Sequence, residues 1–176
     1  MTDKILTYPD PRLRQKADPV AEITPEIRER ALGLVRLMNG GNGESEGIGL
    51  AATQVGWPVR ILVMKWTDHP VTSWSECEDK ILVNPRVQAS GGGRVTASEG
   101  CLSLPGIEAK VERDFEISVE ATDLDGKTVW HCSEGIVARC IQHEMDHLDG
   151  VLFVDRLTPA RKAAIAGKLK ALRRGQ

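Results

Sequence analysis

The sequence lacks any long run of apolar residues. A helix that crosses a bilayer needs about 20 mostly apolar residues in a row, and no such stretch occurs in the 176 residues. The first residues, MTDKILTYPDPRLRQ, also lack the apolar core and the small-residue cleavage site that are typical of an export signal. We therefore expect a cytoplasmic protein with no membrane partner.

Paired cysteine motifs and a strong charge imbalance are also missing. The chain has four cysteines, Cys77, Cys101, Cys132 and Cys140, but no CxxC pair, which disfavours a thioredoxin-type or zinc-ribbon site. With 41% hydrophobic residues, a chain of this length can bury a core without disulfides, so we expect reduced thiols. The net charge of -2 argues against general nucleic-acid binding, and we expect no specific nucleic-acid partner.

Helix patterns are present at both ends of the chain. The first predicted helix has Thr24 as its N-terminal cap and Pro25 at its first helical position. A second helix is expected over residues 134–148. A third helix should begin after Thr158 and continue to the C-terminus, with an apolar seam along one side.

Strand patterns fill the middle of the chain. VRILVM, KILVNP, FEISVEATD and KTVWHCS are short and rich in β-branched residues. We expect Asn84-Pro85 to close the second of these strands and Asp125-Gly126 to form a hairpin turn.

The polar segment 67–79 should be an exposed excursion. No repeat or linker is visible, so the chain predicts one domain, residues 1–176. Its class should be α+β, with mainly antiparallel sheets around the 134–148 helix and a C-terminal helix.

The stretch QHEMDH places two histidines four residues apart on the second helix. His143 and His147 share a narrow stripe with Ile136 and Cys140, and that stripe should face the core. Two histidines at this spacing with a glutamate, Glu144, directly after the first form the HExxH pattern of metal sites. The alternative is a pair of core histidines that are bonded to backbone carbonyls, and this short pattern alone does not exclude it.

A catalytic metal site usually has three protein ligands and an open position, so a third ligand is needed. The candidates are Cys77, Cys101, Cys132, His69, His131 and the carboxylates. Cys101 has the most informative surroundings, because a glycine precedes it and a Pro-Gly turn follows. Cys132 lies in an alternating strand and is expected to pack there. Cys140, one turn before His143, should line a pocket rather than bind the metal.

Three motifs in order make the chain similar to the peptide deformylase family. They are GIGLAATQ at 47–54, EGCLS at 99–103 and QHEMDH at 142–147. The spacing between the motifs also fits, and the resemblance extends from YPDPRLR near the N-terminus to FVDRL near the end. It implies a metal-dependent hydrolase that removes the formyl group from the N-terminal formyl-methionine of newly made polypeptides.

The resemblance also implies roles for individual residues. The family's metal ligands fall on Cys101, His143 and His147, and its acid/base falls on Glu144. Its oxyanion donors fall on the Gln54 side chain and the Leu102 backbone N–H, and Gly49 would pair with the substrate backbone. The resemblance favours iron(II) as the one divalent ion, and Zn²⁺, Ni²⁺ or Co²⁺ can substitute.

Further residues are candidates for the substrate pocket and for support of the site. Ile48, Ile136 and Cys140 should form an apolar wall that accepts methionine, although Ile136 also fits an ordinary core position. Glu99 is the candidate partner for the free nitrogen of a ligand histidine. Arg113 matches a basic position of the family, and we expect an ion pair with a carboxylate in the glycine-rich loop 39–49.

Two other classes of function compete with a deformylase. A zinc protease also carries HExxH, but a thiolate as third ligand is unusual there. A ribosome-binding module could use the C-terminal segment from Arg156 onward, which contains no acidic residue. The six basic residues within 159–176 are spread around the helix, as on a solvated face. The resemblance adds the ribosome as a partner through this helix, which is compatible with catalysis.

Overall fold

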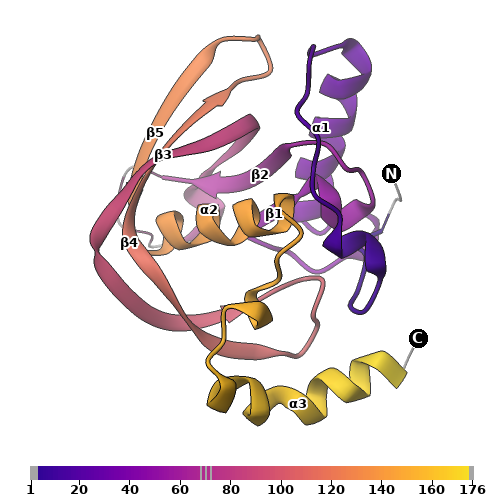
Figure 1. Cartoon of the computed structure of the whole chain (residues 1–176). Coiled ribbons are helices and arrows are strands. Elements are labelled where there is room, and N and C mark those ends of the chain that lie inside the picture. The colour runs from indigo at the N-terminus through magenta and orange to yellow at the C-terminus, as the bar shows by residue number, and fades with distance from the viewer. Residues whose placement is uncertain (1–3, 68, 70, 72, 175–176) are drawn as a thin grey trace.

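The fold comes from a computed structural model of the chain, which describes residues 4–67, 69, 71 and 73–174. One five-stranded sheet dominates it, and every pair of neighbouring strands is antiparallel. In spatial order the strands are β1 (Gly49–Ala51), β2 (Ile61–Trp66), β3 (Glu78–Gly100), β4 (Glu108–Thr122) and β5 (Thr128–Glu134). The long strands β3 and β4 bend, so the sheet forms a curved wall (Figure 1).

Three α-helices accompany the sheet: α1 (Pro25–Met38), α2 (Gly135–Leu148) and α3 (Pro159–Arg174). Short 3-10 turns cover Pro11–Arg14, Gly41–Gly43, Ala52–Val55, Trp74–Glu76 and Phe153–Asp155. Helix α2 runs across the hollow of the curved sheet and contacts β1, β2, β4 and β5 (Figure 1). The predicted α+β class, with antiparallel strands around the HExxH helix, is confirmed.

The helix boundaries follow local sequence signals. The Thr24 hydroxyl accepts a hydrogen bond from the Ile27 N–H, as expected of an N-cap. Helix α2 ends before Gly150, which adopts a φ of +72°. A Cβ atom at Gly150 would lie 2.4 Å from the Arg14 carbonyl oxygen, so this turn requires glycine. The predicted first and second helices are therefore correct to within one residue.

The prediction that Asn84-Pro85 ends a strand was wrong. Strand β3 continues through this dipeptide to Gly100, with a register shift against β4 between Val83 and Arg86. Asn84 has a φ of +52°, and its side chain bonds to the backbone N–H and carbonyl of Val20. A bulge accommodates both this conformation and the proline that lacks an N–H, so the strand bends rather than stops.

Strand β2 is buried on both faces, which explains its continuous apolar sequence. Ile61 and Val63 face the cluster that includes α1, whereas Leu62 and Met64 face the cluster that includes α2. Because side chains alternate along a strand, a strand between two packed layers needs apolar residues at every position. The sheet thus separates two cores, and α2 with its histidines belongs to one of them.

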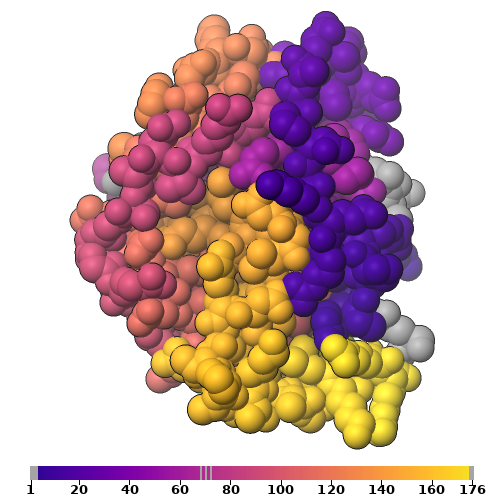
Figure 2. Space-filling view, viewed as in Figure 1, coloured from indigo at the N-terminus to yellow at the C-terminus, as the bar shows by residue number. Residues whose placement is uncertain are grey.

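The N-terminal region, in indigo, borders helix α3, in yellow, on the face shown in Figure 2. Arg14 forms an ion pair with Asp155, and the Arg173 guanidinium donates to the Tyr8 hydroxyl. Helix α3 is attached through the predicted apolar seam: Ile165 is buried, and Leu169 and Leu172 pack partly against the same cluster. None of the helices in the described part of the chain is long and apolar enough to span a membrane.

Candidate active site

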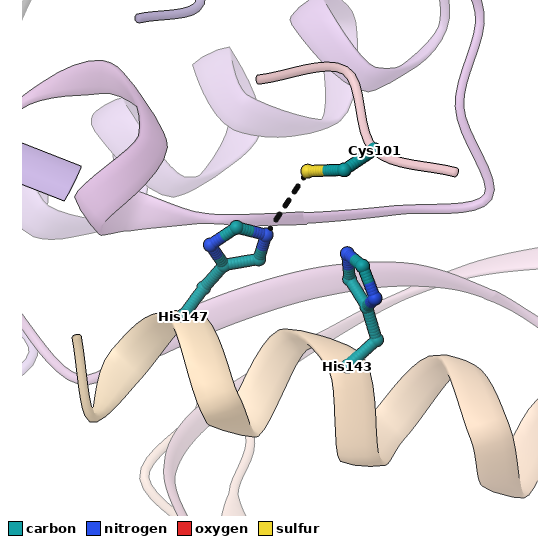
Figure 3. Close-up of side chains that lie close together, drawn as sticks. All are labelled: Cys101, His143 and His147. Carbon is teal, nitrogen blue, oxygen red and sulfur yellow. Dashed lines mark hydrogen bonds between the residues drawn. The ribbon is translucent and has the colours of Figure 1, made fainter. Parts of the chain in front are cut away.

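Helix α2 presents His143, Glu144 and His147 inside the fold. The three residues are 8%, 4% and 1% exposed. The two imidazole rings project from one face of the helix towards Cys101, as the four-residue spacing predicts (Figure 3). Their ring centres are 5.0 Å apart in an edge-to-face arrangement.

Cys101 approaches these rings from the end of β3. Its Sγ atom lies 3.2 Å from Nε2 of His147. Three possible ligand atoms, one each from Cys101, His143 and His147, lie within 4.8 Å of one another. No other cluster of possible metal ligands of this kind occurs among the described residues. Two ligands in a tetrahedral site are separated by ~3.6 Å at the usual metal–ligand distances. A thiolate and two imidazoles in this arrangement therefore fit a divalent transition metal.

Glu99 orients His143 and is itself held by two arginines. Its Oε2 atom lies 2.9 Å from Nδ1 of His143, which is the contact expected for the partner of a ligand histidine. Arg113 binds both Glu99 oxygens, at 2.9 and 3.0 Å, and Arg139 binds Oε1 at 2.7 Å. Burial alone would raise the pKa of Glu99, but the hydrogen bonds from His143 and Arg113 hold that pKa well below its usual range. The ionised Glu99 fixes a proton on Nδ1 and leaves Nε2 of His143 free to bind a metal.

The expected partner of Arg113 was wrong. Arg113 contacts no carboxylate of the glycine-rich loop in the described structure; it joins Glu99 to Asp146, with an Nη1–Oδ2 distance of 2.6 Å. Asp146 in turn binds Arg156. A buried guanidinium requires charged partners. Glu99, two residues before Cys101, and Asp146, directly before His147, provide them.

Glu144 has the surroundings of a proton-transfer group. Burial is the largest cause that raises the pKa of its carboxyl to about 7. Among the neighbouring charges, His143 and Arg113 lower this pKa and Glu99 raises it. Its Oε2 atom is buried and has no hydrogen-bond partner within the described structure. Gly49 packs directly against this carboxylate, since a Cβ at position 49 would lie 2.6 Å from Oε1 of Glu144 and 2.7 Å from Sγ of Cys140. Any larger residue at position 49 would displace one of them.

Gln54 and Leu102 lie on either side of Cys101. Gln54 belongs to the 3-10 turn after β1, and its Nε2 atom lies 3.6 Å from Sγ of Cys101. Leu102 follows Cys101, and no acceptor for its backbone N–H occurs in the part of the chain that the structure describes. Both segments also border a cavity of about 500 Å³ that reaches Cys101, His143 and Glu144.

The expected pocket residues Ile48, Ile136 and Cys140 all line this cavity. The Cys140 thiol donates to the Ile48 carbonyl across 3.4 Å. Ile136, however, does not face the core as its stripe predicted. It is 42% exposed, because it lies in the first turn of α2, at the rim of the cavity. The expectation that Cys132 packs inside was also wrong: its strand is at the sheet edge, and the side chain is exposed.

Comparison with known proteins assigns the family. The sequence model of polypeptide deformylases matches residues 2–163. A peptide deformylase of Desulforudis audaxviator is 42% identical over 160 residues, which cover 90% of this chain and 96% of that protein. Peptide deformylase 2 of Nitrosomonas europaea is 45% identical over 174 residues, 98% of this chain and 87% of that protein. The chain belongs to the polypeptide deformylase family.

Solved structures agree with this assignment. The plant peptide deformylase PDF1B superposes with a TM-score of 0.88 at 35% identity, over 98% of this chain and 89% of that one. A peptide deformylase from Legionella pneumophila gives a TM-score of 0.84 at 34% identity, over 99% of this chain and 96% of that one. This deformylase is therefore a hydrolase that removes the N-terminal formyl group from nascent polypeptides, and its family uses a metal ion.

Four buried polar residues near the site were not predicted from the sequence: Thr53, Ser103, Arg139 and Asp146. Arg139 could have been found, because it lies four residues before His143 on the same helix face, where a charged residue needs a partner. Asp146 and Ser103 carry no comparable local signal. Their partners come from strands and turns that are distant in the sequence.

Replacement of Glu99 by glutamine should weaken metal binding. Glu99→Gln removes the charge that the two arginines share and with it the fixed orientation of His143. We expect the dissociation constant of the metal to rise by ~10–100-fold, measured by competition with a chelator of known affinity. Glu112→Gln is the matched control, because Glu112 pairs with Arg94 on the surface. Unchanged affinity in a folded Glu99→Gln protein would contradict the proposed role of Glu99.

Proposed function

We propose that Cys101, His143 and His147 hold one iron(II) ion and that Glu144 moves the protons of formyl-methionine deformylation. The observation that supports this most is the convergence of one thiol and two imidazoles beside a buried glutamate, Glu144, whose Oε2 atom has no hydrogen-bond partner among the described residues. We further propose that residues 1–176 form one catalytic domain that acts in the cytoplasm.

The donor set supports a borderline-soft divalent ion. Imidazole suits iron, zinc, nickel and cobalt, and thiolate favours softer ions over magnesium or calcium. We propose iron(II) as the native ion because of the likeness to the deformylase family, with Zn²⁺, Ni²⁺ or Co²⁺ as substitutes. A divalent ion in this position supplies Lewis acidity, which polarises a carbonyl group and makes water more acidic.

Glu144 is suited to accept and return a proton near neutral pH. Its pKa of about 7 lets the carboxylate take a proton from the attacking water and later deliver it to the leaving amine. The carboxylate is not needed as a ligand, since the Cys101–His143–His147 cluster supplies three donors without it.

Gln54 and Leu102 are proposed as the donors that stabilise negative charge on the formyl oxygen. Their N–H groups lie on segments that flank Cys101 and border the cavity. Gly49 supports substrate alignment, because β1 is an edge strand that pairs only with β2 among the described residues. The edge of β1 that faces away from β2 can pair with an extended peptide chain.

Glu144→Ala should keep the metal and lose nearly all turnover. The base would be gone, whereas the three proposed ligands would remain, and loss of a general acid–base group typically costs ~10²–10⁴-fold in rate. The measurement pairs elemental analysis of anaerobically purified protein with kcat on a formylated peptide. Glu112→Ala on the surface is the control and should match the parent in both. A Glu144→Ala protein that lost its metal but retained substantial turnover would refute this assignment.

The cavity beside the proposed metal site should select methionine. Ile48 and Cys140 supply apolar surface within it, and Ile136 closes its rim. Each buried methylene adds ~0.8 kcal/mol, so formyl-Ala peptides should have a kcat/KM about 10²-fold lower than formyl-Met peptides. Formyl-norleucine, with nearly the same volume as methionine, should perform similarly. Equal values of kcat/KM for Met and Ala would show that this cavity does not select the first residue.

We propose that α3 also attaches the enzyme to the ribosome. Lys162, Lys170 and Arg174 are exposed and form no ion pair among the described residues. The other basic residues of the helix contact the protein itself: Arg161 binds the Lys110 carbonyl, and Lys168 binds the Gly106 carbonyl. The free charges are thus available to an anionic partner such as ribosomal RNA.

Charge reversal at Lys162 and Lys170 should weaken cosedimentation with ribosomes at low salt and leave kcat on a short peptide unchanged. Attraction between exposed charges is screened by salt, so the difference from the parent should shrink as salt rises. The control reverses two exposed basic residues elsewhere, Arg86→Glu with Lys127→Glu. Equal losses in both double variants would indicate a general charge effect instead of a docking helix.

A further inference from the structure

Ser103, the last residue of EGCLS, binds the side chain of Gln54 in the interior. The Gln54 Nε2 group donates to Oγ of Ser103 across 3.1 Å, and the two residues are 1% and 0% exposed. At its other end, Oε1 of Gln54 accepts a hydrogen bond of 2.8 Å from the Ala51 N–H. The amide is therefore held from both sides.

These two contacts fix which way the amide points. The Ala51 N–H can only donate, so the atom that faces it must be the amide oxygen. The NH₂ group must then face Ser103 and Cys101. A rotation of 180° about the last side-chain bond would place two donors against each other at Ala51, which is costly in a buried site.

Only one of the two Nε2 hydrogens is used by Ser103. The other lies towards Sγ of Cys101, at an Nε2–Sγ distance of 3.6 Å, which is a weak contact. This second hydrogen is the one that can reach a substrate oxygen in the cavity beside Cys101. Precise aim matters here, because an oxyanion donor acts only at the position where charge develops.

We propose that Ser103 is a positioning residue that holds Gln54 with its second N–H aimed at the formyl oxygen. The inference rests on the proposed role of Gln54 as an oxyanion donor. Ser103 does not touch the substrate and binds no metal. It accepts one hydrogen bond and thereby determines where the other donor of the same amide points.

The backbone around Ser103 is held independently of its hydroxyl. The Ser103 carbonyl accepts from the Tyr8 N–H at 2.8 Å, and the Gln54 carbonyl accepts from the Leu6 N–H at 2.7 Å. The segment 6–8 thus bridges the two chain segments that carry the proposed oxyanion donors. Ser103→Ala removes a single oxygen and leaves this bridge intact, so the variant should fold and keep its metal.

The test is a double-mutant cycle of Ser103→Ala and Gln54→Ala, assayed as metal-loaded enzymes on a formyl-Met peptide. Gln54→Ala should lower kcat by ~10²–10³-fold. Ser103→Ala should lower kcat by on the order of 10-fold with KM nearly unchanged. In the Gln54→Ala background, the same Ser103 change should have an effect of less than about 2-fold, because there is no amide left to orient.

The outcomes separate the two proposals. If Gln54→Ala leaves kcat unchanged, the donor role of Gln54 fails and the inference about Ser103 fails with it. If Gln54→Ala lowers kcat but Ser103→Ala does not, or if the two effects multiply, the role of Ser103 alone is overturned. Loss of metal from Ser103→Ala would also overturn it, since the hydroxyl would then be acting on the ligands.

A spectroscopic measurement gives a readout besides activity. In the zinc-loaded protein, the two Gln54 side-chain amide protons should exchange slowly with solvent and give distinct NMR signals. Ser103→Ala should accelerate the exchange and broaden these signals; unaltered signals would contradict the proposal. Ser133→Ala is the matched control, because its hydroxyl is buried in β5 without a hydrogen-bond partner in the described structure. It should change neither kcat nor the Gln54 signals.

Discussion

The buried carboxylate of Glu99 is the group on which the site depends. It accepts hydrogen bonds from Arg113 on β4, from Arg139 on α2 and from His143 on α2, while its own backbone ends β3. Two neighbouring strands and a helix therefore meet at one charge. Removal of one partner from a buried ionic cluster costs ~3–5 kcal/mol, because the remaining charges lose their compensation. The cluster thus couples the integrity of the fold to the orientation of His143, a proposed metal ligand.

The same cluster explains the second acidic residue of HEMDH. Glu144 lines the cavity, and its Oε2 atom has no hydrogen-bond partner in the described structure, whereas Asp146 binds Arg113 and Arg156. One helical turn therefore carries a carboxylate with a pKa near neutrality and another that is fully paired with cations. When the environments of two nearby acidic groups push their pKa values apart, one group can transfer protons while the other stabilises the structure.

Strand β3 provides the long-range connection. Because the strand bends at bulges instead of ending at Asn84-Pro85, it carries the chain from the α1 side of the sheet to Gly100, directly before the proposed metal ligand Cys101. The N-terminal segment 6–8 then braces the loop that follows. The proposed metal ligands and oxyanion donors are thus held by backbone hydrogen bonds and a packed helix, and rigid support of this kind favours a preorganised site.

The sequence alone determined the helices, the class of the fold and the set of residues that could form a metal site. These features depend on local signals: Thr24 and Pro25 at a helix start, alternating apolar residues in strands, and His143 with His147 four positions apart. The three motifs further identified the family. Tertiary structure decided the rest. Whether Asn84-Pro85 ends a strand depends on a partner strand that can accept a bulge. Arg113 binds Glu99 and Asp146 because the pairing of β3 with β4 and the packing of α2 against β4 bring these residues together. The exposure of Ile136 and Cys132 likewise depends on which elements cover them, and no local pattern contains that information.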